Sequence, residues 1–498
     1  MNLTLRASWL AAGKTLGFLC SIALPLVLTR RLEVNDFGAY KQLVTLLGTM
    51  GMILPFGVQM SGHYFLPRLD KKEEKAQIAW IIVLFHLIST SLVALAIGVW
   101  PQSLRLILGP TQLVADHLLV AVLGIVWVVG ALLEYIAVPH GDVRFASVYI
   151  LASNVFRSAC ILAAAIVWRS FHAIAVAALV SSIAQTLSTF WYVQSRFPEF
   201  RGRIHWPLAR TLLGYALPLG AAGMLYTLSI DLHNYMVSAY FGTAMFAVYA
   251  IGCFDLPLVA IIGESTASVM IPRVSELQKQ GRREEIIGVA ARATRGVAAV
   301  YLPLFAFLFV MAGDFIVTVF TKRYAASAPI FRVNLLSLPI SMFIMDPLIR
   351  AYFECRYFYL KLYVWTVAIL TVALYFGMRR YGMIGAISIV IAVLFVGRVA
   401  TFLRIVRLLE LRWADLRQIA DVGKLAIASL AGAAVAYLTR WAILPWPMLA
   451  RLIVAGIVFS VVYLGVGLAL RVPTADERQW FLRTVRSTAF QFRLRRAL

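Results

Sequence analysis

Ionisable side chains inside long apolar runs are the residues of this sequence that could do chemistry. The strongest candidates are four basic and three acidic residues, namely Lys14, Arg157, Arg295, Arg398, Asp231, Asp255 and Glu264. Guanidinium and ammonium groups in apolar surroundings attract anions, and the guanidinium fork matches the oxygens of a phosphate. Carboxylates in the same surroundings can carry a proton or a sodium ion. Because deep cations modestly outnumber deep anions, the set favours an anionic substrate.

Arg157 is the sharpest of the basic candidates. It lies about two helical turns from either end of the segment Ile150–Leu162, so its side chain cannot easily reach water along the helix. Lys14 lies about one and a half turns into its run and could reach water, Arg295 lies deeper in its run than Arg292, and Arg398 is interior but could reach Asp255 or Glu264. We expect these four cations to line an internal cavity, with a structural pairing to a carboxylate as the alternative.

The acidic candidates predict a coupling site for a proton or a sodium ion. Asp231 is followed closely by His233 and Asn234, which together give carboxylate, imidazole and amide groups on one apolar run. Asp255 and Glu264 are the other candidates for this role. The alternative for the Asp231 region is a hydrogen-bonded polar cluster between helices.

The composition shows what surrounds these groups. The chain has 498 residues, of which 61% are hydrophobic and 14% are charged, whereas soluble proteins carry about 25% charged residues. Such a sequence needs the lipid bilayer as solvent, and its long uninterrupted apolar runs predict helices rather than the alternating strands of a barrel. The net charge of +23 resides mainly in loops, so it indicates membrane topology and not nucleic-acid binding.

The predicted fold is all-α, a polytopic membrane protein of about fourteen spanning helices. We expect an N-terminal six-helix bundle at residues 1–203, a pseudo-symmetric second bundle at 204–407, an extra helix pair at 408–470 and a basic cytoplasmic tail at 471–498. The expected spans are residues 8–29, 37–65, 77–100, 113–138, 145–168, 172–194, 212–240, 246–271, 286–311, 325–352, 358–378, 383–406, 423–442 and 449–470.

A repeated motif supports the two-bundle organisation. Phe37 and Tyr40 return as Phe246 and Tyr249, both 209 residues later, and Pro67-Arg68 returns as Pro272-Arg273, 205 residues later. Equivalent bundles that face each other create a central cleft, which rocking exposes to alternate sides of the membrane. Proline and glycine inside the runs, such as Pro55 with Gly57 and Pro218 with Gly220, are expected bending points.

The distribution of basic residues predicts the orientation. An even number of spans puts both termini on one side, and the loops on that side hold about thirty Lys and Arg, against about ten on the other side. We therefore expect the termini to be cytoplasmic. No loop is long enough for a catalytic domain, and the four cysteines lack the spacing of metal ligands. The sequence thus predicts a protein that is not an enzyme and that needs no cofactor beyond a proton or sodium gradient.

The segments around the repeated motif resemble a known family. Leu28-Thr-Arg-Arg-Leu32, Asp36-Phe-Gly-Ala-Tyr40-Lys-Gln and Phe65-Leu-Pro-Arg68 are similar to the signature of the polysaccharide flippases, within the multidrug/oligosaccharidyl-lipid/polysaccharide exporter superfamily. Tyr240-Phe-Gly242 and Phe246-Ala-Val-Tyr249 resemble the counterpart in the second half. There Ala247 replaces a usual glycine, and Leu232 stands where relatives often have a basic residue.

The resemblance implies a rocker-switch flippase of the bacterial inner membrane. Its substrate would be an undecaprenyl-diphosphate-linked oligosaccharide, an O-antigen or polysaccharide repeat unit, moved from the cytoplasmic to the periplasmic leaflet. Its partners would be the lipid bilayer and the polymerase and glycosyltransferases of the same pathway. The alternatives are a multidrug or cation antiporter of the same superfamily, a flippase for the peptidoglycan lipid precursor and, from a different class, a membrane glycan polymerase or ligase.

Overall fold

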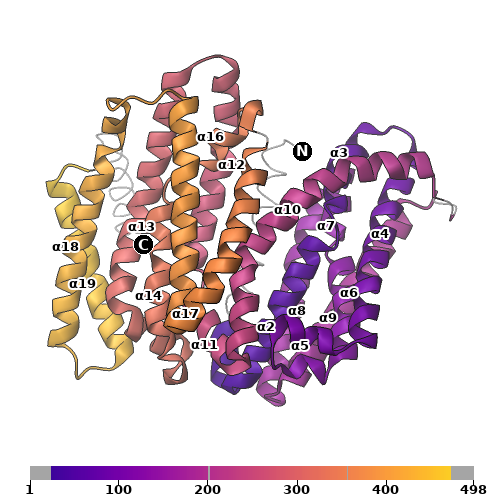
Figure 1. Ribbon diagram of the computed structural model, residues 1–498, viewed down its shortest axis with the longest axis horizontal. Helices are drawn as coiled ribbons and strands as arrows, with labels where there is room; N and C mark the ends of the chain where they lie inside the picture. The colour runs from indigo at the N-terminus through magenta and orange to yellow at the C-terminus, as the bar shows by residue number, and fades with distance from the viewer. Residues whose placement is uncertain (1–23, 200–201, 203, 356, 473–498) are drawn as a thin grey trace, which may run out of the picture. The chain divides into compact units, whose positions relative to one another are not determined.

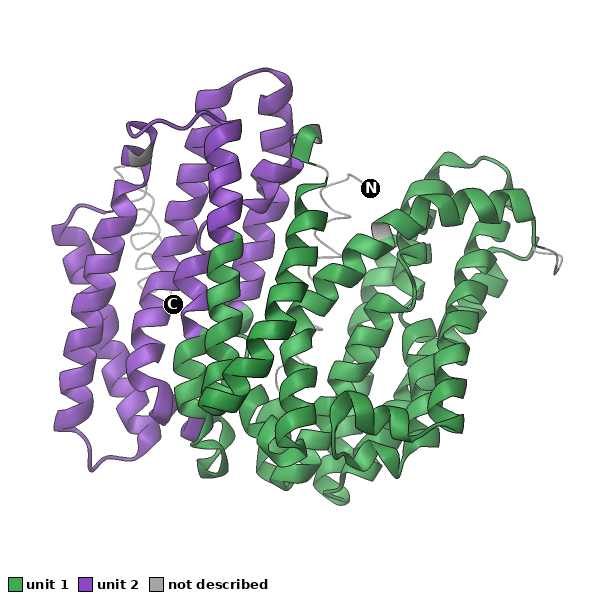
Figure 2. Cartoon of the chain, viewed as in Figure 1, with its two compact units in different colours: residues 1–257, 319–334, 354–397 green, residues 258–318, 335–353, 398–498 purple. Residues whose placement is uncertain are grey.

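The computed structural model describes residues 24–199, 202, 204–355 and 357–472, and every regular element in this part of the chain is a helix. The chain divides into two compact units, each made of several segments (Figure 2). Unit 1 comprises residues 1–257, 319–334 and 354–397, and unit 2 comprises residues 258–318, 335–353 and 398–498. The predicted division into bundles at residues 203 and 407 concerns internal symmetry and stays a prediction.

Unit 1 contains the helices from α2 to α10 in chain order, which follow a helical stretch at residues 24–31. They are α2 Val34–Ile53, α3 Val58–Phe65, η1 Leu66–Arg68, α4 Lys72–Val99, α5 Gln102–Leu108, η2 Gln112–Val114, α6 His117–Gly130, α7 Leu133–His140, α8 Val143–Val167, α9 Phe171–Arg196 and α10 Trp206–Phe241 (Figure 1). It also contains α11 Thr243–Gly252, η3 Lys322–Tyr324, α14 Ser327–Leu335 except its last residue, and most of α17 Phe358–Leu408. Local signals set some boundaries, since the Ser170 hydroxyl accepts a hydrogen bond from the Ala173 N–H at the start of α9.

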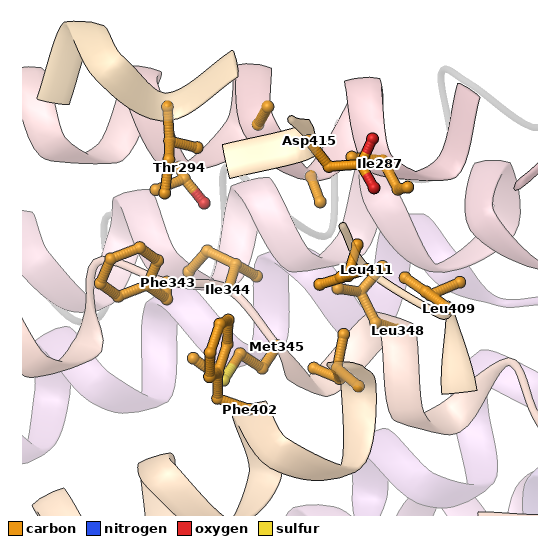
Figure 3. A pocket seen from close by; sticks show the side chains of 14 residues that line it. Ile287, Thr294, Phe343, Ile344, Met345, Leu348, Phe402, Leu409, Leu411 and Asp415 are labelled. Carbon is orange, nitrogen blue, oxygen red and sulfur yellow. The ribbon is translucent and has the colours of Figure 1, made fainter. Parts of the chain in front are cut away.

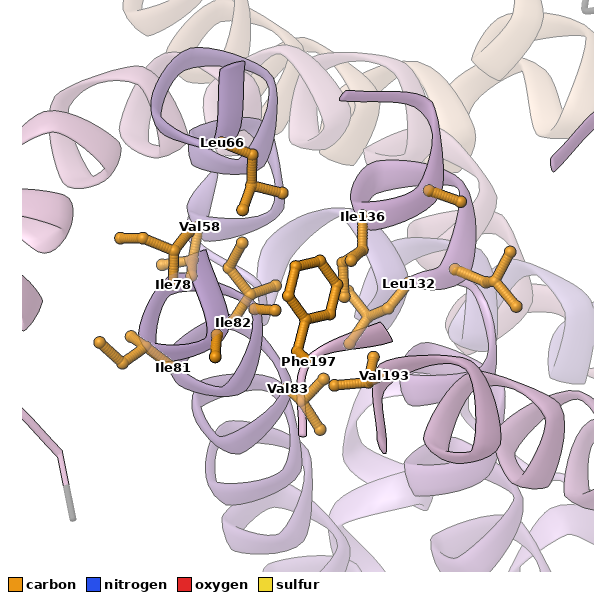
Figure 4. Close-up of a cluster of buried hydrophobic side chains, with 14 of the residues drawn as sticks. Val58, Leu66, Ile78, Ile81, Ile82, Val83, Leu132, Ile136, Val193 and Phe197 are labelled. Atoms are coloured by element: carbon orange, nitrogen blue, oxygen red, sulfur yellow. The ribbon is translucent and has the colours of Figure 1, made fainter. Parts of the chain in front are cut away.

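A hydrophobic core cluster of unit 1 consists of aliphatic side chains together with Tyr192 and Phe197. Val58 of α3, Ile82 of α4, Leu132 before α7, and Val193 and Phe197 at the end of α9 are all buried in it (Figure 4). Helices α6 and α9, α4 and α6, and α8 and α9 pack against one another around this core. This packing fixes the positions of the polar side chains that the same helices carry.

Unit 2 is built around the long helix α13 and the C-terminal helix pair. It holds α12 Pro257–Lys279 after its first residue, α13 Arg283–Phe320 up to Thr318, α15 Ser337–Ser341, α16 Asp346–Arg350, η5 Asp415–Ile419, α18 Ala420–Ala442 and α19 Met448–Ala469. Helices α18 and α19 pack closely because Gly432 lies against the Phe459 ring and Ala433 and Ala436 leave room for it. Small residues of this kind are the usual contact between membrane helices.

The all-α membrane fold is confirmed. In the described residues ten helices are long and apolar enough to cross a membrane, or eleven if the bent pair α2–α3 counts as one span. The predicted count of fourteen is not confirmed, and the predicted span at residues 8–29 lies mostly outside the described residues. The run at 325–352 forms three short helices and not one span. The run at 246–271 is broken at residues 253–256, just before Pro257 starts α12. Proline at the start of a helix is favourable, but within a helix it removes a hydrogen bond.

Spans 358–378 and 383–406 run together as α17, which bends sharply at Gly382. Gly382 adopts φ 60° and ψ −145°, a conformation that only glycine reaches readily. A methyl group on Gly385 would come within 2.4 Å of the Gly377 carbonyl oxygen. These two residues could not approach so closely in a straight helix, so the chain reverses direction at Gly382 and two helices result.

The predicted bend at Pro55 and Gly57 is confirmed. Helices α2 and α3 meet at an angle of 48°, with Gly57 in the left-handed conformation between them. This break rests directly on α10, because a methyl group on Gly220 would lie 2.1 Å from the Phe56 carbonyl oxygen. Pro218, the other expected bending point, lies within α10, which is continuous. The bend and the partner helix thus touch through backbone atoms.

We predict opposite effects of alanine at two glycines of α10. Gly220→Ala should lower the yield and thermal stability of folded protein, because the new methyl group must push the α2–α3 break away from α10. Gly223→Ala is the matched control, since a methyl group there meets no atom within 4 Å, and alanine is the better helix former by roughly 1 kcal/mol. Thermal unfolding of the purified proteins measures both, and equal stability of the two variants would contradict the close contact.

Candidate functional site

Arg157 lies among α6, α8 and α9 of unit 1 and is held there by uncharged groups. Its Nη2 donates to Gln185 Oε1 at 2.5 Å, and its guanidinium carbon lies 4.2 Å from the centre of the Trp127 ring. Tyr40 and Tyr149 are close enough to interact with it electrostatically. Its Nε is buried without an acceptor, and within the described residues no carboxylate forms an ion pair with it. The positive charge is therefore positioned but not neutralised.

Lys41 is a cation that the sequence interpretation missed. It follows Tyr40 on α2, is partly buried, and lies within electrostatic range of Asp255 and Cys253. It lies within the first turns of the predicted run 37–65, where a lysine can reach water at the membrane surface, and it was not singled out from the sequence. The available signal was its position inside the repeated motif. It follows Tyr40 on a buried helix, and successive residues of a helix lie on different sides of it.

Asp231 belongs to a polar cluster between α2 and α10. Its Oδ2 accepts a hydrogen bond from Thr49 Oγ1 at 3.0 Å, and the Asn234 side chain forms a second one. The Tyr235 hydroxyl donates to the Thr45 carbonyl oxygen at 3.4 Å in the same region. The carboxylate is half-buried, and these partners are neutral. The cluster joins the two helices and leaves one negative charge between them.

His233 points to a different neighbour from Asp231. Its Nδ1 lies 2.9 Å from the Tyr249 hydroxyl, and the Tyr249 side chain also hydrogen-bonds Cys253. Cys253 is in turn within electrostatic range of Lys41 and Asp255. The structure therefore does not join His233 to Asp231. It joins His233 to a second polar chain, which runs along α11 to Lys41.

The repeated motifs meet in a buried polar cluster around Gln42, which we call the Gln42 knot. Gln42 Nε2 donates to Ser238 Oγ at 2.7 Å and more weakly to the Leu108 carbonyl oxygen at 3.4 Å. Its Oε1 accepts from Thr111 Oγ1 at 2.7 Å and from Thr243 Oγ1 at 3.4 Å. The knot thereby ties α2 to the end of α10, to the start of α11 and to the connection between α5 and η2.

The two copies of the motif pack on each other at the knot. Helix α2 begins at Val34 and α11 begins at Thr243, which reproduces the 209-residue shift (243 − 34 = 209). A methyl group on Gly38 would lie 2.2 Å from the Thr243 carbonyl oxygen, so glycine is required for the approach. Phe37 and Phe246 are both buried there. Gly38, Phe37 and Phe246 of the motif therefore pack the two helices together.

The other two described basic candidates, in unit 2, have acidic partners. Arg295 Nε lies 3.7 Å from Asp421 Oδ2, and its Nη2 donates to the Val472 carbonyl oxygen at 3.0 Å. Arg398 Nη1 lies 3.8 Å from Asp346 Oδ2, a partner other than the Asp255 or Glu264 that we expected. Lys14 lies outside the described residues. Arg157 therefore belongs to unit 1, whereas the two paired arginines belong to unit 2.

The acidic candidates are also separated. Asp231 and Asp255 belong to unit 1 but to different polar clusters, whereas Glu264 lies on α12 of unit 2 with its side chain exposed. Among the described residues no group of three or more His, Cys, Asp or Glu could hold a metal ion.

Unit 2 contains a pocket that is almost wholly apolar. It encloses about 620 Å³ of space, part of it open to solvent, between α13, α16, the end of α17 and η5. Figure 3 shows Phe343, Phe402 and Leu348 on its walls, with Thr294 and Asp415 as its polar members. A hydrogen bond from the Arg412 N–H, together with the charge of Arg283 3.1 Å away, lowers the pKa of Asp415. Because that carboxylate is already engaged, the pocket suits hydrocarbon and not a phosphate.

Comparison with known proteins identifies the family. Residues 27–329 match the model of a family described as polysaccharide biosynthesis protein, which is more than half of the chain. The sequence matches no curated protein. Among solved structures, the lipid II flippase MurJ in an inward closed conformation is 13% identical, with a TM-score of 0.68 over 91% of this chain and 99% of that chain.

Two MATE transporters have the same fold at similar sequence distance. An inward-facing MATE family transporter of the MOP superfamily is 14% identical, with a TM-score of 0.61 over 80% of this chain and 94% of that chain. A mutant of the Vibrio cholerae MATE transporter VcmN is 15% identical, with a TM-score of 0.56 over 83% of this chain and 99% of that chain. At such identities the likeness establishes the fold. The protein is thus a multi-pass membrane protein that belongs to the polysaccharide biosynthesis protein family and has the fold shared by MurJ and the MATE transporters.

Proposed function

We propose that the protein is a flippase for a polyprenyl-diphosphate-linked oligosaccharide, which it moves from the cytoplasmic to the periplasmic leaflet of the bacterial inner membrane by alternating access. The family description and the fold of a lipid II flippase support this substrate class. In this proposal the protein is not an enzyme, both termini are cytoplasmic, and the undecaprenyl chain stays in lipid while the diphosphate and sugars cross through the protein.

The unneutralised charge of Arg157 is the observation that carries the proposal. A cation inside a membrane bundle costs a few kcal/mol on insertion scales, and such residues normally pair with an opposite charge. Arg157 instead is oriented by an amide, an indole face and phenols. An anionic substrate that reaches this guanidinium would supply the missing charge, and a diphosphate offers the bidentate oxygens that arginine binds best.

The remaining cations rank behind Arg157. Arg295 and Arg398 have acidic partners, so a diphosphate must compete with Asp421 or Asp346 for them. Lys41 lies near Asp255. When an anion arrives, Lys41 can exchange this carboxylate for the anion. We assign Lys14, Arg157, Arg295 and Arg398 to substrate binding, as the sequence indicated, and add Lys41 to them.

A multidrug or cation antiporter is the second candidate, because Asp231 is a carboxylate with neutral partners only, as a cation site would require. In the flippase proposal the same carboxylate, with Asp255 and Glu264 as further candidates, couples the return of the empty carrier to a proton or sodium gradient. The two functions differ in cargo. A neutral side chain at position 157 would impair the flippase and would not affect a cation antiporter.

Replacing Arg157 tests the flippase proposal. Arg157→Gln removes the charge, and because hydrogen bonds to charged groups contribute about 1.5–3 kcal/mol, export of lipid-linked oligosaccharide should fall by roughly 10- to 100-fold. Arg157→Lys should keep partial activity. Arg210→Gln, an exposed arginine at the start of α10, is the control. Surface glycan in a strain lacking the native protein, at equal protein level, is the measurement, and wild-type export by both Arg157 variants would refute the role.

Asp231→Asn tests the coupling role. The amide keeps the hydrogen bonds to Thr49 and Asn234 but cannot carry a proton or attract a sodium ion, so transport should lose its dependence on an imposed ion gradient. Thr49→Val is the matched control, because it removes the hydrogen bond and keeps the carboxylate. Transport in proteoliposomes with a proton or a sodium gradient decides, and unchanged gradient dependence of the Asp231 variant would assign the residue to packing.

The Gln42 knot is the proposed outer gate, since the predicted topology places the start of α2 on the periplasmic side. Opening toward that side requires α2 to separate from α10 and α11. Gln42→Leu removes the central amide, and amide hydrogens of residues 108, 109, 111, 112 and 243–246 should then exchange about tenfold faster, for a loss of about 1.4 kcal/mol. Gln59→Leu, at a buried glutamine of α3 whose Oε1 has no partner, is the control. Unchanged exchange in the Gln42 variant would remove the gate assignment.

A further inference from the structure

Two arginines and one aspartate form a charged cluster at one end of the C-terminal helix pair. Arg440 lies in the last turn of α18, Arg451 in the first turn of α19, and Asp314 near the end of α13. Arg451 Nη2 is 3.1 Å from Asp314 Oδ1, and Arg440 Nε donates to Asp314 Oδ2. The Asp314 side chain is 3% exposed, that of Arg451 9% and that of Arg440 25%.

The charges of this cluster do not balance. Two guanidinium groups share one carboxylate, which leaves one positive charge in excess. The Nε of Arg451 is buried and has no acceptor among the described residues. Arg440 has further N–H groups beyond the one that Asp314 accepts, and it is exposed enough for a ligand to reach them. A second negatively charged hydrogen-bond acceptor would balance the charge of the cluster.

The surrounding elements also favour an anion. Helix α19 begins directly after Pro447, which provides no side-chain cap, so the N–H groups of its first turn remain available. The positive end of the helix dipole points the same way. Trp441 and Trp446 are exposed beside the loop that joins α18 to α19, as expected for side chains at the membrane–water interface. The excess charge therefore lies at the depth of lipid headgroups.

We infer that Arg440, Arg451 and the start of α19 bind the phosphate of an anionic lipid headgroup, with Asp314 holding the two arginines in place. The site belongs to unit 2 and uses none of the residues around Arg157, so the inference holds whatever cargo the protein carries. A bound lipid neutralises the cluster and fixes the helix pair to α13, which Phe459 already contacts through the apolar cluster with Ala306 and Met311. The predicted topology puts this headgroup in the periplasmic leaflet.

The experiment compares full-length protein in nanodiscs of phosphatidylcholine alone and with added phosphatidylglycerol. The wild type should unfold several degrees higher with phosphatidylglycerol and retain this lipid in native mass spectrometry. Arg440→Gln, which leaves one arginine for one carboxylate, should lose most of the shift. Arg105→Gln, an exposed arginine of α5 on the same predicted side, should keep it. A full shift in Arg440→Gln would overturn the inference.

Asp314→Asn separates lipid binding from a purely structural cluster. It leaves two arginines without a carboxylate, which destabilises the protein in neutral lipid. If the site binds an anionic lipid, phosphatidylglycerol should restore stability by a larger shift than in the wild type. Equal destabilisation in both lipids would show that the cluster only joins helices. Inorganic phosphate in place of the lipid should give no shift, and a shift equal to that of phosphatidylglycerol would overturn the assignment to a lipid.

Discussion

The cost of placing charge in a membrane interior governs where the ionisable residues of this protein lie. In unit 2 Arg295 meets the carboxylate of Asp421, and Arg398 meets that of Asp346. Arg157 in unit 1 does not follow this pattern, because Gln185 and Trp127 orient it without cancelling its charge. A protein that stabilises an unpaired cation by neutral groups keeps an electrostatic attraction available for a ligand.

The repeated motif provides the rigid frame on which such charges are held. Gly38 lets α2 approach the start of α11 through backbone atoms, and Gly220 does the same for the α2–α3 break against α10. Contacts of this closeness allow little sliding, so a helix that moves must separate as a unit. The Gln42 knot lies at one such contact, where its hydrogen bonds replace those that water would provide. Close glycine contacts and the hydrogen bonds of a single buried amide hold this interface together. Opening it therefore costs a definite amount of free energy.

Charged groups in the two units have different physical roles. The carboxylate of Asp231 has only neutral partners and stays available to a small cation. Asp415, by contrast, is bound by the Arg412 N–H and by Arg283, and it holds these residues together beside an apolar pocket. The Asp314 cluster has the opposite imbalance, with positive charge in excess at a helix end. The same residue types are therefore left with a negative charge, a balanced charge or a positive charge, depending on what compensates them.

The sequence by itself determined the features that depend on composition and local pattern. Its hydropathy gave the all-α membrane fold, Pro55 and Gly57 gave the bend between α2 and α3, and the 209-residue shift of Phe37 and Tyr40 gave the two helix starts that pack together. It also placed Arg157 too deep to reach water along its own helix. These follow from the chain's local properties, since burial in lipid and backbone geometry act within a few turns.

Only the tertiary structure decided which charges are compensated. No spacing in the sequence pairs Arg398 with Asp346, since these residues lie 52 positions apart (398 − 346 = 52) on different helices. No spacing in the sequence links Lys41 to Cys253 and Asp255 either, and it is α11 and the following loop that bring them near it. His233 and Asp231 are neighbours in sequence, but a helix turns about 100° per residue and sends them to different partners. Electrostatic partnership is a property of three-dimensional proximity, which the linear chain does not encode at short range.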